Sequence, residues 1–258
     1  VSAGNEDSAR MSEKIEGTIA LVTGANRGIG RAITEALLQR GAAKVYAGAR
    51  NPQSLTDLSE HHADRVVPIE IDVTDAEKVV SAAEQAGDVR LLINNAGAAF
   101  GGGLADANIA ETAQQEIDVN YIGPLRLIQQ FSAILGSNGG GAIVNVVSVA
   151  GLTNFAFFPT YSASKAAAHS LTQGSRALLA GQGTTVHGVY PGPVDTAMAE
   201  SVDMDKATPA DVASAILDGV ESGTEDIYPD AFAEQFGQQF SESPKASEQQ
   251  MAAMIAST

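Results

Sequence analysis

The pentapeptide YSASK, residues 161–165, places a tyrosine four residues before a lysine among small neighbours. Residues four apart share one face of a helix, so Lys165 can lie beside Tyr161. A phenol has an ordinary pKa of about 10 and is a poor base at neutral pH. A neighbouring ammonium favours the phenolate and lowers that pKa, which would tune the phenol for proton transfer. The pair by itself does not separate an acid–base centre from an ordinary helix surface, so the surrounding elements must decide.

Short apolar runs alternate along the chain with longer helical patterns. Strands are expected at residues 18–24, 44–49, 65–73, 91–95, 142–148, 185–190 and 226–229. Helices are expected at about 28–41, 75–86, 107–136, 160–181 and 209–221. Near-continuous apolar strands that alternate with helices indicate a parallel sheet covered on both faces. We therefore predict one doubly wound α/β domain of about seven strands over residues 17–258, with a polar tail from about 231 that this pattern does not place.

Composition narrows the function classes. The formal net charge of −16 opposes binding to phosphate backbones, so we expect no nucleic-acid partner. No apolar stretch approaches the roughly 20 residues that cross a bilayer, so we expect no membrane partner. The absence of cysteine excludes disulfides and thiolate sites. Residues 1–16 are polar and lack the apolar run of a secretory signal. We expect them to form a flexible extension and the protein to be cytoplasmic.

A glycine-rich segment, TGANRGIG at residues 23–30, joins the first expected strand to the first helix. Gly24 permits a tight turn, and Gly28 and Gly30 let the backbone approach a pyrophosphate closely. The helix that follows offers free N–H groups to an anion. Because ligands of parallel sheets bind beyond the carboxyl ends of the strands, this turn is a candidate phosphate site.

The spacing T-G-x-x-x-G-x-G and several later motifs resemble the short-chain dehydrogenase/reductase family, in its non-extended branch. The other matching features are NNAG at 94–97, Asn120, Ser148, the Tyr161–Lys165 pair and PGPVDT at 191–196. They occur in the family's order and spacing from about residue 17 to 230. The resemblance implies a single-domain Rossmann fold and an oxidoreductase that interconverts a ketone or aldehyde and an alcohol by hydride transfer. It also implies a homotetramer or homodimer.

The end of the second expected strand favours one nicotinamide cofactor over the other. NAD-binding folds usually carry an acidic residue there for the ribose 2′-hydroxyl, whereas this chain has Ala49 followed by Arg50. A guanidinium binds a phosphate through two parallel hydrogen bonds, and Arg27 inside the glycine turn could add a second positive charge. We therefore predict NADP(H). Asp72 resembles the family residue that accepts from the adenine amine, with Val73 beside it.

The resemblance assigns a role to each catalytic candidate. Tyr161 is the acid/base, Ser148 holds the substrate carbonyl, Lys165 also binds the nicotinamide ribose, and Asn120 positions a water in a proton relay. In the segment PGPVDT, the Val194 backbone and the Thr196 hydroxyl are implied to contact the carboxamide. The full expected cofactor set comprises Gly24, Asn26, Arg27, Gly28, Ile29, Gly30, Arg50, Asp72, Val73, Asn94, Ala96, Gly97, Tyr161, Lys165, Pro191, Gly192, Val194 and Thr196.

The expected substrate wall is apolar and aromatic, which favours a hydrophobic ketone or aldehyde over a sugar phosphate. It comprises Ala98, Phe100, Val149, Phe155, Phe158, Tyr190 and Met198. The segment between PGPVDT and the helix near 209 is short, which suggests an open pocket and a broad substrate range.

Other functions fit the residues less well. An extended-branch epimerase would carry glycine at position 27, which is arginine here. A halohydrin-dehalogenase-like relative would have replaced Lys165, and enoyl reductases commonly space the tyrosine and lysine more widely. The four histidines form no metal-ligand pattern, so no metal site is expected. A non-catalytic NADP sensor or scaffold is the alternative, although all four catalytic positions are intact.

Overall fold

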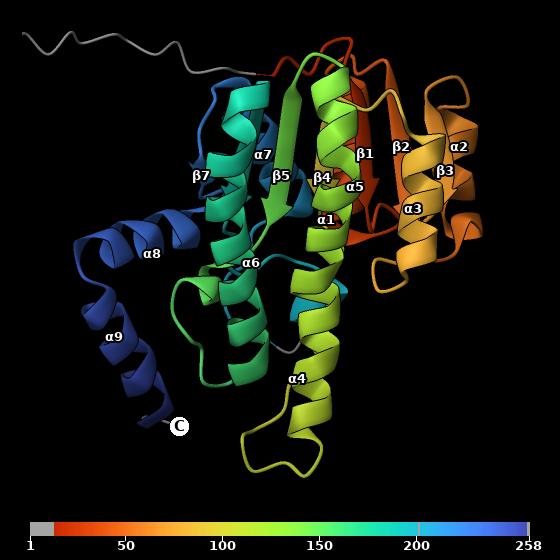
Figure 1. Cartoon of the computed structure of the whole chain (residues 1–258). Helices are drawn as coiled ribbons and strands as arrows, with labels where there is room; N and C mark the ends of the chain where they lie inside the picture. The colour runs from red at the N-terminus through yellow and green to blue at the C-terminus, as the bar shows by residue number, and fades with distance from the viewer. Residues whose placement is uncertain (1–12, 201, 257–258) are drawn as a thin grey trace, which may run out of the picture.

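The computed structural model describes residues 13–200 and 202–256, so residues 1–12 of the expected N-terminal extension lie outside the described part. Among the described residues, parallel strands form one sheet in the order β3-β2-β1-β4-β5-β6-β7 (Figure 1). The strands are β1 (Ile19–Thr23), β2 (Lys44–Ala49), β3 (Val66–Glu70), β4 (Leu91–Asn94), β5 (Gly141–Val146), β6 (Thr184–Val189) and β7 (Asp226–Ile227). The predicted doubly wound sheet of about seven strands is confirmed.

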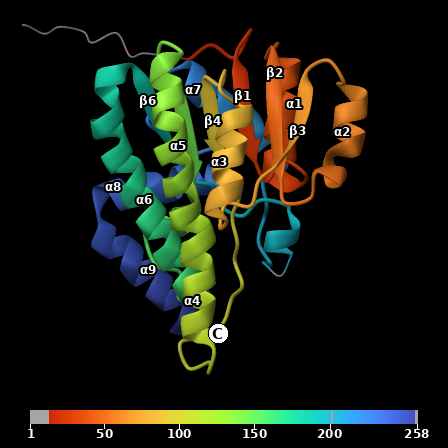
Figure 2. The ribbon, with the colours of Figure 1, turned by 45° about the vertical axis from the view of Figure 1, so that its right-hand side comes forward.

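Successive strand residues pack against different helix layers, because side chains alternate between the two faces of a sheet. On one face Ala20 and Val22 of β1 join the side chains of α1 (Gly28–Gln39) and α7 (Pro209–Glu221). On the other face Leu21 of β1 joins α3 (Ala76–Gln85) and α5 (Gly123–Ser137), and α6 (Pro159–Leu179) packs against the same cluster through Leu171 and Leu179. Figure 2 shows these two layers on either side of the sheet.

Two short helical elements precede β3 in a segment where the sequence predicted none. They are η1 (Pro52–Leu55) and α2 (Thr56–His61). The buried side chains of Leu55 and Leu58 attach them to the core beside β2. The segment is too short for a strong helical period, which explains why the sequence did not reveal it. The strand that follows, β3, is an edge strand, and an edge position tolerates Pro68.

The helix predicted over 107–136 contains an inserted π-helical segment. α4 (Ile109–Ile117) and α5 are joined by the π-helical residues Asp118–Ile122, so helical structure runs from 109 to 137 with a wider turn at Asn120. Gly123 N–H donates to the Asp118 carbonyl. Pro124 has no N–H to donate to the Asn120 carbonyl four residues earlier. The wider turn therefore frees a main-chain carbonyl near Asn120.

The polar tail forms two helices, α8 (Ala231–Glu242) and α9 (Pro244–Ala256). Phe236 of α8 and Met251 of α9 enter a third apolar cluster together with Val147, Val149 and Ala168. Figure 1 shows α8 and α9 beside α6, beyond the carboxyl ends of the strands. The tail thus borders the side of the molecule where the strands end.

Candidate active site

The order of the strands reverses between β1 and β4, and this creates a crevice at their carboxyl ends. The glycine turn leaves β1 at this point and enters α1. Gly24 has a φ of 67° and Gly28 a φ of 54°, a left-handed conformation that side-chain-bearing residues rarely adopt. The turn therefore needs glycine at both positions.

Side chains that the sequence analysis did not select hold this turn in place. Asn95 Nδ2 donates to the Thr23 carbonyl at 2.8 Å and to the Gly24 carbonyl at 3.4 Å. The Thr23 hydroxyl accepts from the backbone N–H groups of Asn95 and Ala96 at 3.0 Å each. A Cβ on Gly30 would overlap the Gly24 carbonyl and the Asn95 amide. The NNAG motif thus supports the glycine turn directly. Its second asparagine, Asn95, is the site residue that the sequence analysis missed.

The beginning of α1 fits a phosphate. Its N-cap residue, Arg27, makes no side-chain cap, and the described helix carries no acidic residue in its first turn. No side chain of the helix therefore occupies its first N–H groups, which can bind an anion. Position 28 tolerates no side chain without crowding Thr196, whose Cγ2 lies 3.2 Å from where a Cβ would stand. Arg27 and Arg50 are both exposed at the same edge. A dinucleotide's pyrophosphate and a 2′-phosphate are therefore chemically matched here.

Asp72 and Val73 lie in the turn that follows β3. Asp72 Oδ1 accepts from the Thr74 backbone N–H at 3.0 Å and from the Thr74 hydroxyl at 2.7 Å. Partial burial raises the pKa of Asp72, but these hydrogen bonds outweigh that effect and the pKa falls below its ordinary value. Asp72 is thus a carboxylate that can still accept from an adenine amine. Val73 is buried against Gly123, and its side chain leaves no room for a Cβ there.

The chemical groups gather where β5 ends and α6 begins. Lys165 Nζ lies 5.7 Å from the centre of the Tyr161 ring and donates to the Val146 carbonyl at 2.9 Å. Ser148 follows β5, and its Oγ accepts from the Ala150 N–H at 3.1 Å. The Ser148 hydroxyl is also a hydrogen-bond partner of the Tyr161 phenol. The structure therefore brings these three predicted residues together.

Burial dominates the electrostatics of this cluster. It raises the pKa of Tyr161 to about 12; the hydrogen bond with Ser148 acts against the rise, and the negative charge of Glu116 adds to it. It lowers the pKa of Lys165 to about 8. The pKa of the phenol thus moves in the direction opposite to the one expected from a neighbouring ammonium, because burial disfavours the phenolate. Tyr161 is thus a protonated acid at neutral pH.

Asn120 connects three parts of the site through its side chain. Its Nδ2 donates to the Ala98 carbonyl and to the Ser164 hydroxyl, both at 2.8 Å, and its Oδ1 accepts from the Ala98 N–H at 2.9 Å. Ser164 in turn donates to the Tyr161 carbonyl at 2.7 Å. The side-chain amide of Asn120 is therefore occupied by protein partners. The main-chain carbonyl that the π-helical turn frees remains available to bind a water.

The other predicted cofactor residues differ in what they expose. A Cβ on Gly97 would lie 3.4 Å from Asn120 Oδ1 and 3.6 Å from Lys165 Nζ, so this backbone borders the catalytic cluster. Asn94 is buried and donates to Asn145 Oδ1 at 2.8 Å, and its own Oδ1 finds no hydrogen-bond partner in the described part of the chain. Pro191 and Val194 are buried too, so they would contact a cofactor through their backbone. The remaining partly exposed members are Asn26, Ile29, Ala96 and Gly192.

The predicted substrate wall divides into exposed and buried members. Phe100 is 58% exposed and Met198 is 45% exposed, whereas Ala98, Phe155 and Phe158 are partly buried. Phe155 packs against Phe236 of α8 with ring centres 5.6 Å apart. The C-terminal tail therefore supports one member of this wall.

Tyr190 and Val149 do not fit the wall, and their assignment to it is wrong. Tyr190 has no exposed surface; its hydroxyl contacts His169 Nδ1 at 2.7 Å and Asp226 Oδ1 at 3.3 Å, and its ring stacks on Tyr228. Val149 is buried in the same apolar cluster. Both residues belong to the core that joins the tail to β6, because every surface they could offer a substrate is already covered.

A statistical model of the family described as short chain dehydrogenase matches residues 18–207, which is more than half of the chain. The chain belongs to this family. An uncharacterized oxidoreductase of Staphylococcus aureus strain MW2 is 36% identical over 207 residues, covering 77% of this chain and 89% of that protein. One from Staphylococcus epidermidis is 34% identical over 194 residues, covering 74% and 84%. The protein is therefore an oxidoreductase.

Solved structures of short-chain dehydrogenases share the architecture. One from Burkholderia cenocepacia, in complex with NADP, is 42% identical with a TM-score of 0.87 and covers 92% of this chain and 98% of that chain. One from Burkholderia phymatum, in complex with NAD, is 27% identical with a TM-score of 0.75 and covers 83% and 89%. Both relatives thus bind a nicotinamide cofactor, but one binds NADP and the other NAD.

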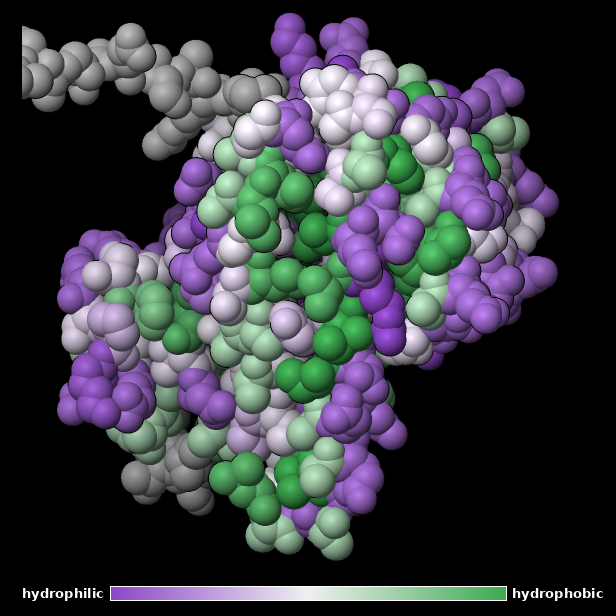
Figure 3. Space-filling view, viewed as in Figure 1, coloured by the Kyte–Doolittle hydropathy of each residue, from purple (hydrophilic) through white to green (hydrophobic). Residues whose placement is uncertain are grey.

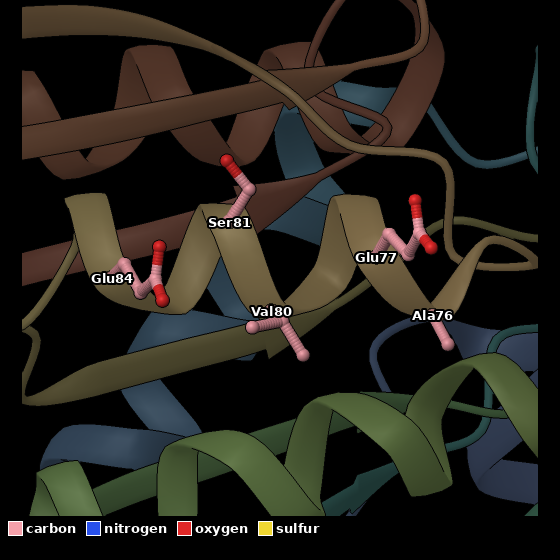
Figure 4. A pocket seen from close by; sticks show the side chains of 5 residues that line it. All are labelled: Ala76, Glu77, Val80, Ser81 and Glu84. Atoms are coloured by element: carbon pink, nitrogen blue, oxygen red, sulfur yellow. The ribbon is translucent and has the colours of Figure 1, made fainter.

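A surface depression of this short-chain dehydrogenase lies away from the catalytic residues. Figure 4 shows it on α3, lined by Ala76, Glu77, Val80, Ser81 and Glu84. Its polar groups are two carboxylates and the Ser81 hydroxyl, and no lining side chain is cationic, so nothing there could bind a phosphate or stabilise an oxyanion. We therefore place the site at the crevice instead. In the described part of the chain, no helix combines the length and apolarity needed to cross a membrane.

Proposed function

We propose that this short-chain dehydrogenase interconverts a carbonyl compound and an alcohol, with NADP(H) as the hydride carrier and Tyr161 as the acid/base. The observation that carries the proposal is the cluster of Tyr161, Lys165 and Ser148 at the end of β5, beside the glycine turn that enters α1. When bound, NADPH supplies the hydride.

The chain's own residues manage the proton. A carbonyl that receives hydride develops negative charge on oxygen, and the protonated phenol of Tyr161 donates to that oxygen. The Ser148 hydroxyl, already a partner of the phenol, orients the same oxygen. With a pKa of about 8, Lys165 is mostly charged at neutral pH and stabilises the negative charge that Tyr161 acquires. The residues Gly24, Gly28, Gly30, Arg27 and Thr196 would hold the cofactor.

A proton must then return to Tyr161. The wider helical turn and the missing N–H of Pro124 leave the Asn120 carbonyl without its usual helical donor, close to the loop that the Asn120 side chain anchors. We propose that a water bound there connects Lys165 to solvent. Asn120 itself acts as a positioning residue, since its amide is bonded to Ala98 and Ser164.

Loss of the phenol tests the catalytic role. We expect Tyr161→Phe to lower kcat for carbonyl reduction by at least about 10²-fold, because a positioned general acid contributes about 10²–10⁴-fold. The measurement is NADPH-dependent turnover over a broad panel of ketones and aldehydes, with cofactor affinity measured in parallel. Unimpaired turnover of the variant would refute the assignment of Tyr161.

A non-catalytic NADP-binding sensor is the second candidate. Its distinguishing result would be tight NADPH binding by the wild-type protein with no turnover on the whole panel. The intact set of Asn120, Ser148, Tyr161 and Lys165 favours the enzyme.

The choice of NADP(H) over NAD(H) rests on Arg50. Arg50 is exposed at the end of β2, directly after Ala49, the position where NAD-binding folds usually carry an acid. We expect Arg50→Ala to raise KM for NADPH about tenfold, because a charge-assisted hydrogen bond is lost. KM for NADH should hardly change. An equal effect on both cofactors would contradict the preference.

Exposed apolar side chains support a proposal about the substrate and another about the oligomeric state. Exposed Phe100 and Met198 near the crevice favour a hydrophobic ketone or aldehyde. Figure 3 shows hydrophobic side chains gathered over the face formed by α4, α5 and α6. Leu125 of α5 and Leu178 of α6 are exposed. We propose a homodimer or homotetramer built on this face, to be checked by light scattering. The cytoplasmic location stays a prediction.

A further inference from the structure

Glu116 is a fully buried acid in α4 that none of the roles above uses. It is 0% exposed, although a buried carboxylate normally needs hydrogen-bond partners for both oxygens. One oxygen, Oε1, accepts from the Phe100 N–H at 2.8 Å, and the other, Oε2, has no partner among the described residues. An acid held so far from water at a cost to folding calls for a function.

The position of Glu116 connects it to the catalytic cluster. It lies one helical turn before Asn120, so the two side chains share a face of the helix. Asn120 holds the loop after β4 at Ala98, and Glu116 holds the same loop at Phe100. Figures 1 and 2 both show α4 alongside the first turns of α6, the helix that carries Tyr161.

We infer that Glu116 is a positioning residue of the active site: it fixes the loop over residues 98–100 through Phe100, and its charge acts on the phenol of Tyr161 from the neighbouring helix α4. The inference rests on the proposed function, since it concerns the same acid/base. A negative charge at this place favours the neutral phenol, which is the form that donates a proton to a reduced carbonyl. It opposes the phenolate, which is the form that alcohol oxidation requires.

The charged groups around the phenol make this assignment specific. Lys165 faces it from α6, and Glu116 acts on it from α4, where its charge raises the pKa of Tyr161. The other titratable side chains of the neighbouring elements make contacts of their own: Asp118 accepts from Gln114, Asp106 accepts from Gly103, His169 contacts Tyr190, and Asp195 is exposed. Among the described residues, Glu116 is the acid whose charge acts on the pKa of Tyr161, so neutralising Glu116 removes that effect.

Two substitutions separate the charge from the contact. Glu116→Gln removes the charge and keeps an oxygen that can accept from Phe100. Glu116→Asp keeps the charge and withdraws it by one methylene, which breaks the contact with Phe100. Glu111→Gln is the matched control, because Glu111 is an exposed acid of the same helix. Thermal melts verify that each variant is folded.

The pH dependence of kcat/KM for NADP-dependent alcohol oxidation tests the charge. We expect the midpoint of its rising limb to move to lower pH by about half a unit or more in Glu116→Gln, and to stay in place in Glu116→Asp and Glu111→Gln. We expect KM for the carbonyl substrate to rise at least threefold in Glu116→Asp and to change less in Glu116→Gln. A Glu116→Gln profile that superimposes on the wild type would overturn the inference, and so would an unchanged KM in Glu116→Asp.

A measurement without turnover keeps this test separate from the proposed function. Ultraviolet tyrosinate absorbance is recorded at high pH for the wild type and for Glu116→Gln, and each is corrected by the same protein carrying Tyr161→Phe. We expect a larger ionised fraction of Tyr161 in Glu116→Gln. Equal fractions would overturn the role of Glu116, whereas an inactive wild type with unequal fractions would refute only the proposed reaction.

Discussion

Lys165 should cost the folded protein stability at neutral pH, and the cost should fade as the pH rises. The side chain is 5% exposed, and burial lowers its pKa from 10.5 to about 8. The unfolded chain therefore binds the proton more tightly than the folded chain between these values. By linkage, the penalty is about 3 kcal/mol at pH 7, about 2 kcal/mol at pH 9 and about 1 kcal/mol at pH 10.

Lys165→Met removes the charge while it retains a long, flexible side chain. The variant loses the hydrogen bond to the Val146 carbonyl, which costs about 1–3 kcal/mol at every pH. At pH 7 this loss and the relief of the penalty nearly offset each other. As the pH rises, the penalty in the wild type becomes smaller, whereas the variant has no such penalty. The unfolding free energy of the wild type should therefore increase by about 1 kcal/mol relative to that of the variant between pH 7 and pH 9.

The assay is reversible urea unfolding of both proteins at pH 7, 8 and 9, at one protein concentration and without cofactor. The informative quantity is the difference in unfolding free energy between the two proteins, since titration of the other groups largely cancels. A difference that does not change from pH 7 to pH 9 would refute the reasoning, because it would mean that Lys165 keeps an ordinary pKa in the folded state. The variant should also lose turnover.

Two further predictions concern packing. Gly30→Ala should destabilise the protein by about 1–3 kcal/mol and weaken NADPH binding, because the added Cβ meets the Gly24 carbonyl and the Asn95 amide, neither of which can yield. Gly87→Ala, where no atom lies within 4 Å of the added Cβ, is its control, and equal melting temperatures for the two variants would contradict the argument. Tyr190→Phe should lower the unfolding free energy by about 1 kcal/mol, or the melting temperature by about 2–4 °C, because His169 loses a partner at 2.7 Å. Its kcat and KM should match the wild type; a changed substrate preference would restore Tyr190 to the substrate wall.

The regular elements were predictable wherever local pattern and tertiary environment agree. The strand over 44–49 and the helix over 209–221 match the structure to the residue. The strand is buried at every position after Lys44, and the helix begins with a Thr-Pro cap and has a clear apolar face. The cluster at Tyr161 was predictable for a similar reason. Helical spacing brings Lys165 to the tyrosine, and strand ends bring Ser148 to both.

What sequence reasoning missed depends on residues far apart in the chain. Asn95 supports the glycine turn only because β4 lies next to β1. The tail helices find their place only because Phe236 and Met251 meet an apolar cluster that contains Val147 and Tyr190, which directly follow β5 and β6, and Ala168 of α6. Tyr190 looked like a substrate residue because the sequence gives its position after β6. The sequence does not reveal that the side chain is buried.

The amino-acid sequence by itself determined the strand–helix alternation and the glycine turn, because these follow from side-chain type and short-range spacing. The candidates for proton transfer were selected by the resemblance to a known family. The tertiary structure decided the electrostatics. Whether a phenol's pKa falls or rises depends on how much water its anion keeps and on which charges face it, and for Tyr161 the burial and the remote acid Glu116 set that balance. The pKa depends on all the groups that surround the phenol in space, and no local sequence pattern specifies those groups.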